Sequence, residues 1–353
     1  MIFLILLLFL YFKLHKKNTF SLLLISFFCA LFIILLIIYS KDAILACKSG
    51  ISLWFNVVFP SLFPFFVICE ILKNTKVSLV IGSFFENLMR PLFNVPGVCA
   101  FTFFLGMLSG YPIGANFTLK LYQDKLITKE EAQRLITFTN NSGPIFVISS
   151  IGYGFLKNKQ IGILLYICHV LSSICVGIIF SFYKRNNICK FQKTYLANTT
   201  YKNYNDNFIK VLTNAIISSL KTIIHIAGFI VFFSVIIKLL YKIQFFYYIA
   251  KILSPITTLL NLEPNFIPSF LSGIIEITSG ISLISTLSAT TYFAKILSTA
   301  FLLGFAGVSI HFQIYSVICK SDINILPFFV GKFIHGVLNC LFMYLLLQNN
   351  LVY

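Results

Sequence analysis

The sequence is poor in charge. Only 10% of its 353 residues are Asp, Glu, Lys or Arg, whereas 58% are hydrophobic. A soluble domain carries about 25% charged residues, so this chain could not cover its surface with polar groups in water. Its apolar runs are long and continuous, as in 22–39, and lack the strict alternation of a membrane barrel. We therefore expect an all-α polytopic membrane protein, because helices satisfy their backbone hydrogen bonds within lipid.

Acidic residues are scarcer still, with 10 Asp and Glu against 27 Lys and Arg, a net charge of +17. The cations occupy short segments between apolar runs, which is typical of cytoplasmic loops and argues against a nucleic-acid partner. The longest polar segment, 183–210, is basic and predicts a cytoplasmic linker. It divides the chain into an N-terminal membrane anchor or spans (1–48), a first membrane half (49–182) and a second membrane half (211–353).

The sequence also lacks the usual motifs of catalysis. It contains no nucleotide-binding glycine loop, no HExxH metal motif and no Ser/His/Asp arrangement that spacing would reveal. Its nine cysteines form no CxxC pair, so they are interpreted as small apolar residues of helices. We expect no enzyme, no cofactor and no metal. The expected partners are the lipid bilayer and a small polar solute or ion, and a homo-oligomer is left open.

Hydropathy predicts candidate membrane spans at roughly 19–40, 51–72, 97–119, 138–155, 160–182, 211–240, 243–262, 265–288, 292–318 and 324–348. The mixed segment 77–96 fits an interfacial or re-entrant position better. Thr128 followed by Glu131 predicts a capping box that begins a short helix.

What the sequence does have is a set of Gly, Ser and Pro interruptions at matching places in the two halves. They lie at 109–115 and 140–144 in the first half, and at 271–280 and 304–313 in the second. Broken backbone at membrane depth is tolerated only where it is buried in protein or lines a wet cavity. Matched interruptions point to the binding site of a transporter. We expect two transporter-like halves with re-entrant or broken helices, in which an inverted repeat is one arrangement. Close helix packing through small residues is the alternative.

Glu276 lies in an apolar run between Gly273 and Gly280, and a carboxylate within the membrane marks a functional site by default. Its expected neighbours are His311, Gln313 and the amides of 140–141, and Glu276 with His311 could carry a proton. A structural hydrogen bond is the alternative role. The candidate solute-binding residues are Ser109, Gly110, Pro112, Gly114, Asn140, Asn141, Ser142, Gly143, Glu276, Thr278, Gly307, Ser309, His311 and Gln313. The lone histidines 169, 225 and 335 are interpreted as core residues.

The motifs at 109–115, 138–144 and 304–313, together with 54–65 and 89–97, resemble those of the YlbJ family of sporulation integral membrane proteins. The resemblance runs from about Ser49 to the C-terminus. It implies Gate (nucleoside recognition) domains, which also occur in concentrative nucleoside transporters and bacterial ferrous-iron transport proteins. Carried over by position, the Gate motifs fall on Gly110, Pro112, Gly114, Asn140, Ser142, Gly143, Gly307, Ser309, His311 and Gln313. The name of the domain does not establish a nucleoside as the substrate.

The resemblance implies a multi-pass protein of the cell membrane that is needed for spore formation, in particular for the cortex. Together with the interruptions, it predicts a secondary-transporter-like carrier of a small polar solute or ion. The alternative is a non-transporting membrane scaffold for enzymes of spore-envelope assembly. A membrane enzyme that acts on a lipid-linked cortex precursor is disfavoured by the lack of clustered carboxylates.

Overall fold

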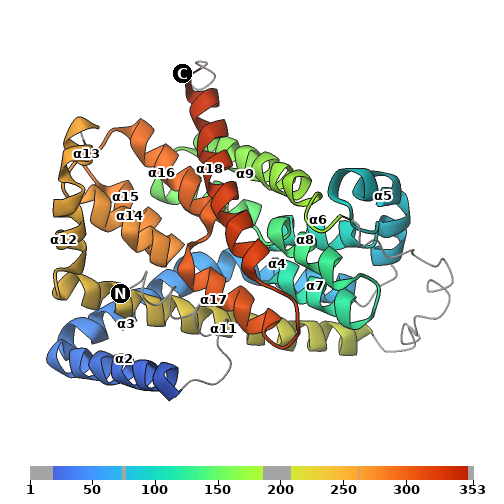
Figure 1. Ribbon diagram of the computed structural model, residues 1–353, viewed down its shortest axis with the longest axis horizontal. Helices are drawn as coiled ribbons and strands as arrows, with labels where there is room; N and C mark the ends of the chain where they lie inside the picture. Colours follow the sequence, from blue (N-terminus) through green and yellow to red (C-terminus); the bar gives the residue numbers. More distant parts are fainter. Residues whose placement is uncertain (1–18, 74–76, 186–207, 261, 349–353) are drawn as a thin grey trace.

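The computed structural model describes residues 19–73, 77–185, 208–260 and 262–348 (Figure 1). Every regular element within these ranges is a helix. Five helical segments are long and apolar enough to cross a membrane: Ser40–Leu72, Lys159–Phe180, Phe208–Lys242, Tyr292–Ile318 and Leu326–Gln348. The prediction of an all-α polytopic membrane protein is confirmed. The start of the chain and most of the basic segment 183–210 lie outside the described residues.

The first described helices run from one end of the molecule to the other (Figure 1). They are α2 (Thr19–Ile38), α3 (Ser40–Leu53), the π-helix η1 (Trp54–Val58), α4 (Phe59–Lys73) and α5 (Val77–Phe93). The long helix α11 (Phe208–Lys242) packs against α3 and α4. It is followed by two short helices, α12 (Phe245–Ile252) and α13 (Ser254–Leu259). These replace the span expected at 243–262, because Gln244 is left-handed and Pro255 interrupts the helical hydrogen bonding.

Two of the interruptions are helical hairpins. The first consists of α6 (Cys99–Ser109) and α7 (Ile113–Gln123), and the second of α14 (Phe266–Ile275) and α15 (Ile277–Thr286). Gly280 packs so closely on the Cα atom of Gly273 that a Cβ would overlap it. Residues seven apart in one straight helix are about 10 Å apart, so the chain must turn back between them. Helices α6 and α7 also pack on each other. The segments 97–119 and 265–288 are therefore hairpins and not the single spans that hydropathy predicts.

The other two interruptions separate a helix from its continuation. Helix α8 (Lys129–Phe138) is followed by the non-helical segment 139–144 and the π-helix η2 (Ile145–Phe155). Helix α16 (Tyr292–Phe305) meets α17 (Gly307–Ile318) at Ala306, which has φ 74°. The predicted capping box is present at the start of α8, where Thr128 Oγ1 accepts from Glu131 N and Glu131 Oε2 accepts from Thr128 N.

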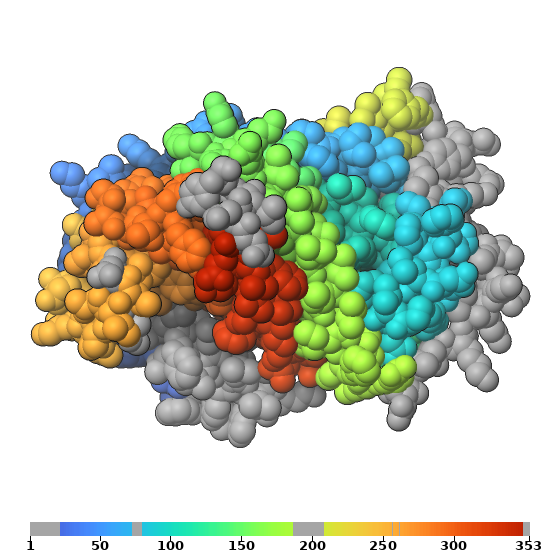
Figure 2. Space-filling view, turned by 90° about the horizontal axis from the view of Figure 1, so that it is seen from above, coloured from blue at the N-terminus to red at the C-terminus, as the bar shows by residue number. Residues whose placement is uncertain are grey.

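Each broken helix is followed by one long helix, α9 (Lys159–Phe180) or α18 (Leu326–Gln348). The order hairpin, broken helix, long helix thus occurs twice along the chain. Helix α18 crosses the centre of the molecule and packs against both α16 and α9 (Figure 1). Figure 2 shows the same contact from above, with α18 in red against the green of α9. The inverted relation of the two sets stays a prediction.

Candidate functional site

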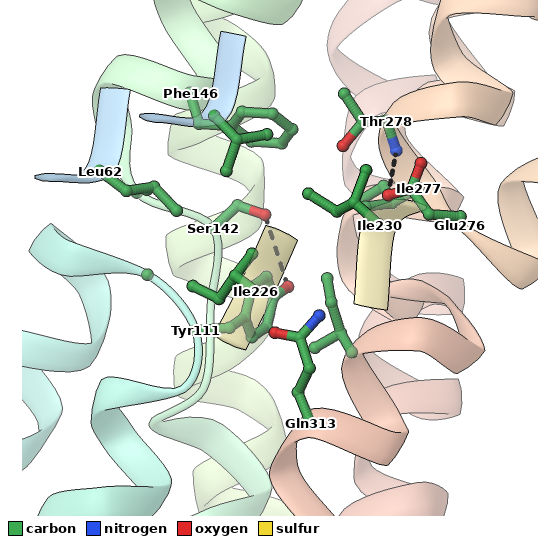
Figure 3. Close-up of a pocket in the computed structure, with 14 residues that line it drawn as sticks. Leu62, Tyr111, Ser142, Phe146, Ile226, Ile230, Glu276, Ile277, Thr278 and Gln313 are labelled. Atoms are coloured by element: carbon green, nitrogen blue, oxygen red, sulfur yellow. Dashed lines mark hydrogen bonds between the residues drawn. The ribbon is translucent and has the colours of Figure 1, made fainter. Parts of the chain in front are cut away.

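All four interruptions contribute to one buried cavity (Figure 3). Its polar wall comes from the α6–α7 turn, the segment 139–144, the α14–α15 turn and α17, and an apolar wall comes from α4, η1 and α11. The lining residues are Val58, Leu62, Gly110, Tyr111, Ser142, Gly143, Phe146, Ile226, Ile230, Glu276, Ile277, Thr278, Ile310 and Gln313. The space that water could enter is about 40 Å³. This holds a few water molecules at most.

Glu276 forms the turn between α14 and α15, where its backbone is extended at φ −139° and ψ 113°. Its carboxylate accepts hydrogen bonds from the backbone N–H groups of Thr278 at 3.1 Å and Ser279 at 2.7 Å. It is only 2% exposed. A carboxylate is stabilised at this position because the N-terminus of a helix carries partial positive charge and unpaired N–H groups. The side chain therefore caps α15 and borders the cavity at once.

Several polar groups of the cavity are weakly satisfied. Ser142 Oγ is 3.4 Å from the Tyr111 hydroxyl, and Gln313 Nε2 is 3.5 Å from Ser309 Oγ. Gln313 Oε1 is buried and has no hydrogen-bond partner among the described residues. Figure 3 shows Gln313 reaching towards the space between Ser142 and Thr278. Such an orphan acceptor costs about 1–3 kcal/mol unless water or a solute donates to it.

Other predicted site residues hold the interruptions together and do not line the cavity. Asn140 Oδ1 accepts from Ala115 N at 2.8 Å, while its Nδ2 donates to Ile136 O at 3.1 Å. Gly114 lies against the Thr139 carbonyl, in a space that no Cβ would fit. Ser109 contacts the thiol of Cys69 at 2.6 Å. Pro112 precedes α7, and Gly307, at φ 73°, lies against the second hairpin.

His311 does not line the cavity, whereas Glu276 does. Its ring packs edge-on against Phe305, Phe328 and Phe329, with ring centroids 4.8, 5.3 and 5.2 Å away. Of the predicted residues, the cavity brings together Gly110, Ser142, Gly143, Glu276, Thr278 and Gln313. Solute binding by any of the predicted residues stays a prediction.

The comparisons with known proteins agree with this architecture. A family model described as "Gate: Nucleoside recognition" matches residues 55–185 and 223–320. The sporulation integral membrane protein YlbJ of Bacillus subtilis (strain 168) is 35% identical over 347 residues, which cover 95% of this chain and 84% of the relative. The chain belongs to the YlbJ family. No solved structure matches it.

In this YlbJ-family protein all four interruptions fall within the two ranges that match the Gate model. The ranges end before α18. The family membership confirms a multi-pass integral membrane protein of a sporulation family with a Gate domain.

Sequence reasoning missed one polar cluster next to the cavity. Lys332 of α18 is fully buried, and its Nζ lies 3.2 Å from Asn141 Oδ1, 3.3 Å from His335 Nδ1 and 5.4 Å from the centre of the Tyr111 ring. The rings of His335 and His169 stack at 4.5 Å. The sequence does mark Lys332 as a candidate functional residue, because it is the one charged residue in the apolar segment 326–348.

Proposed function

We propose that the protein is a secondary-transporter-like carrier that binds a small polar solute or ion in this cavity and serves spore formation, in particular the cortex. One observation carries the proposal: polar groups from all four interruptions face a single cavity, and the buried Gln313 Oε1 there lacks a partner among the described residues. Packing alone would favour apolar or fully paired groups at such a place.

The cavity offers both donors and acceptors. Glu276 and Gln313 supply acceptor oxygens, and the hydroxyl groups of Tyr111, Ser142 and Thr278 can donate or accept. A small solute with hydroxyl or amine groups would complete these contacts. The twofold occurrence of hairpin, broken helix and long helix supports the division into halves at 49–182 and 211–353.

A second, larger cavity of about 570 Å³ lies between α3, α11 and α15, and it supports a route by which the solute leaves the first cavity. Its polar lining consists of Ser49, Ser234, Lys238, Tyr241, Ser279 and Ser282. Helix α15 separates the two cavities, because Thr278 faces the first while Ser279 and Ser282 face the second. Movement of the second hairpin would join them and expose the bound solute to one side, as alternating access requires.

The test is Thr278→Val, which removes one cavity hydroxyl at constant shape, with Thr286→Val on the exposed part of α15 as the matched control. Each variant would replace YlbJ in B. subtilis cells that lack it, with spore yield and protein level measured. In parallel, liposomes with the purified protein would be screened by mass spectrometry for uptake from a mixture of small polar metabolites. We expect Thr278→Val to lower uptake and spore yield at an unchanged protein level, and Thr286→Val to be neutral.

A scaffold makes the opposite prediction. It would tolerate Thr278→Val in the spore assay and would take up no compound into liposomes. Either a fully active Thr278→Val variant in cells or a wild-type protein without uptake of any compound in the mixture would contradict the carrier proposal.

A further inference from the structure

Among the described residues, Lys332 is a fully buried basic side chain without an acidic partner. Its described contacts are the neutral Asn141 Oδ1 and His335 Nδ1 and the face of the Tyr111 ring. No carboxylate among the described residues pairs with it. An unpaired ammonium is expensive inside a protein and more so inside a membrane, where an ionisable residue marks a function by default.

The hydrogen bonds around Lys332 define the protonation of both stacked histidines. The His169 carbonyl can only accept, so His335 Nε2 carries the proton and donates it at 3.0 Å, and His335 Nδ1 is left to accept from Lys332. The backbone N–H of Ser142 donates to His169 Nε2 at 3.1 Å, so the proton of His169 lies on Nδ1. That Nδ1 is buried without a partner among the described residues. Both imidazoles are therefore neutral, and Lys332 is the donor in its two hydrogen bonds.

The groups that face Lys332 are all basic or neutral. They are His335 of α18, His169 of α9, His311 of α17 and Tyr111 of the α6–α7 turn. The charged groups of the other packed helices are engaged elsewhere: Glu131 of α8 with Arg90, Arg134 of α8 with the Tyr183 carbonyl, and Lys295 of α16 with the Ser285 carbonyl. A second positive charge would repel the first at short range, so the cluster holds one extra proton at a time.

We propose that Lys332, His335 and His169 form a proton-binding site that couples proton movement to the solute cavity. The coupling rests on the proposed carrier function. A proton is the ligand that this chemistry suits, because no three His, Cys, Asp or Glu residues in the described part of the chain converge as metal ligands. Transfer along the 3.3 Å contact breaks an N–H bond of Lys332 Nζ and forms one at His335 Nδ1, which leaves a neutral amine.

The link to the cavity is the backbone at 141–142. Lys332 binds the side chain of Asn141, and His169 binds the amide of Ser142, which lines the cavity. A proton on His169 Nε2 would place two N–H donors face to face in place of this hydrogen bond and would release Ser142. Solute at Ser142 and a proton at His169 therefore act on one peptide group, and each alters the affinity for the other.

The proton site can be tested without any solute. The full-length protein, labelled with ¹⁵N-histidine and placed in lipid bilayers, is titrated between pH 4.5 and 8.5 by solid-state NMR, with signals assigned by His→Gln variants. We expect the signals of His169 and His335 to change together. In Lys332→Met the imidazolium fraction at pH 6 should rise by about threefold or more, because a nearby positive charge is gone. Lys295→Met, which removes a lysine away from the cluster, is the control and should match the wild type.

Two outcomes would overturn the proton site: both histidines stay neutral over the whole range in the wild-type protein, or Lys332→Met titrates as the wild type does. If the Lys332→Met variant does not accumulate in cells, the titration of the wild-type histidines alone tests the proton site. A separate transport arm compares exchange at equal pH with accumulation driven by a pH gradient, using the same metabolite mixture. If the wild-type protein exchanges no solute, the carrier proposal is wrong. If it exchanges solute but a pH gradient does not drive accumulation, only the proposed coupling to protons is wrong.

Discussion

At the scale of single residues, Glu276 combines a structural and a functional position. Both carboxylate oxygens accept backbone N–H groups of α15, and the same side chain borders the cavity. An amide in its place keeps one acceptor and loses the negative charge at the helix N-terminus. Glu276→Gln should therefore lower the free energy of unfolding by about 1 kcal/mol and reduce solute uptake much more strongly than that loss of stability explains.

Glu263→Gln is the matched control for this change. Glu263 also accepts a backbone amide, that of Ala289 at 2.9 Å, but it lies outside the cavity. Thermal unfolding in detergent gives the stability of both variants, and uptake per folded molecule gives their activity. Equal activity of the two variants would show that Glu276 serves only as a cap.

The sequence marks both Glu276 and Lys332 as candidate functional residues, but it does not show which residues Lys332 contacts. Each is a charged residue in an apolar segment, and that context alone marks both positions. The meaning of Lys332 depends on Asn141, which is 191 residues away in sequence. His169 and His335 are likewise 166 residues apart, and each alone fits a core histidine. Only the packing of α18 on α8 and α9 makes them one cluster.

At the scale of elements, the hairpins depend on glycines that allow two helices to touch. Gly280 of α15 contacts the backbone of Gly273 in α14, and a Cβ at 280 would overlap it. Backbone cannot move aside as a flexible side chain can, so Gly280→Ala should prevent accumulation of folded protein.

Gly228 in α11 provides the control, because an added Cβ would meet nothing within 4 Å there. Gly228→Ala should be neutral or stabilise by up to about 1 kcal/mol, since alanine is the better helix former. The amount of monodisperse protein after size-exclusion chromatography measures both. A well-folded Gly280→Ala variant would contradict the close contact of α14 and α15.

The positions of the interruptions could be predicted from the sequence, but their geometry could not. Turns or breaks occur at 110–112, 139–144, 276 and 306, within or beside the segments that the Gly, Ser and Pro pattern marked. Whether a break turns the chain back depends on contacts such as Gly273 with Gly280, which hydropathy does not report. For the same reason 97–119 and 265–288 have the composition of single spans although they form hairpins.

An ion pair between Lys129 of α8 and Asp322 of the loop 319–325 lies outside the candidate membrane spans, and its contribution to stability should depend on pH. Lys129, by a hydrogen bond of 2.8 Å, and Tyr122 hold the pKa of Asp322 below its usual value. A lowered pKa in the folded state stabilises it above the unfolded value of about 3.9, and this contribution is lost as pH falls through the folded value. The pair is exposed, so the effect is at most about 1 kcal/mol.

Asp322→Asn should therefore raise amide hydrogen exchange in 319–325 at pH 7, and the difference from the wild type should disappear under acid conditions that protonate Asp322. Asp124→Asn, at an exposed carboxylate that follows α7, is the control. Exchange in the loop that is unchanged by Asp322→Asn at pH 7 would show that the ion pair does not hold it.

At the scale of the whole molecule, the two cavities differ in a way that suits alternating access. The inner one, at about 40 Å³, is too small for a metabolite, while the outer one offers about 570 Å³. Helices α11 and α15 contribute side chains to both. Of these two helices α15 is much the shorter. It packs on α14 and α16, and its residues Ser279 and Ser282 line the larger cavity, so we expect access to depend on the position of α15.

Filling the outer cavity should stop transport without touching the inner one. Ser282 lines the outer cavity on α15, so Ser282→Cys treated with a bulky methanethiosulfonate reagent should lose most of its uptake. Ser83→Cys on the exposed face of α5 is the matched control and should keep its uptake after the same treatment. The treated parent protein accounts for its native cysteines. Because the label on Ser282 would fill the outer cavity, full uptake after complete labelling would mean that the solute leaves by another route and that α15 is not the moving partition.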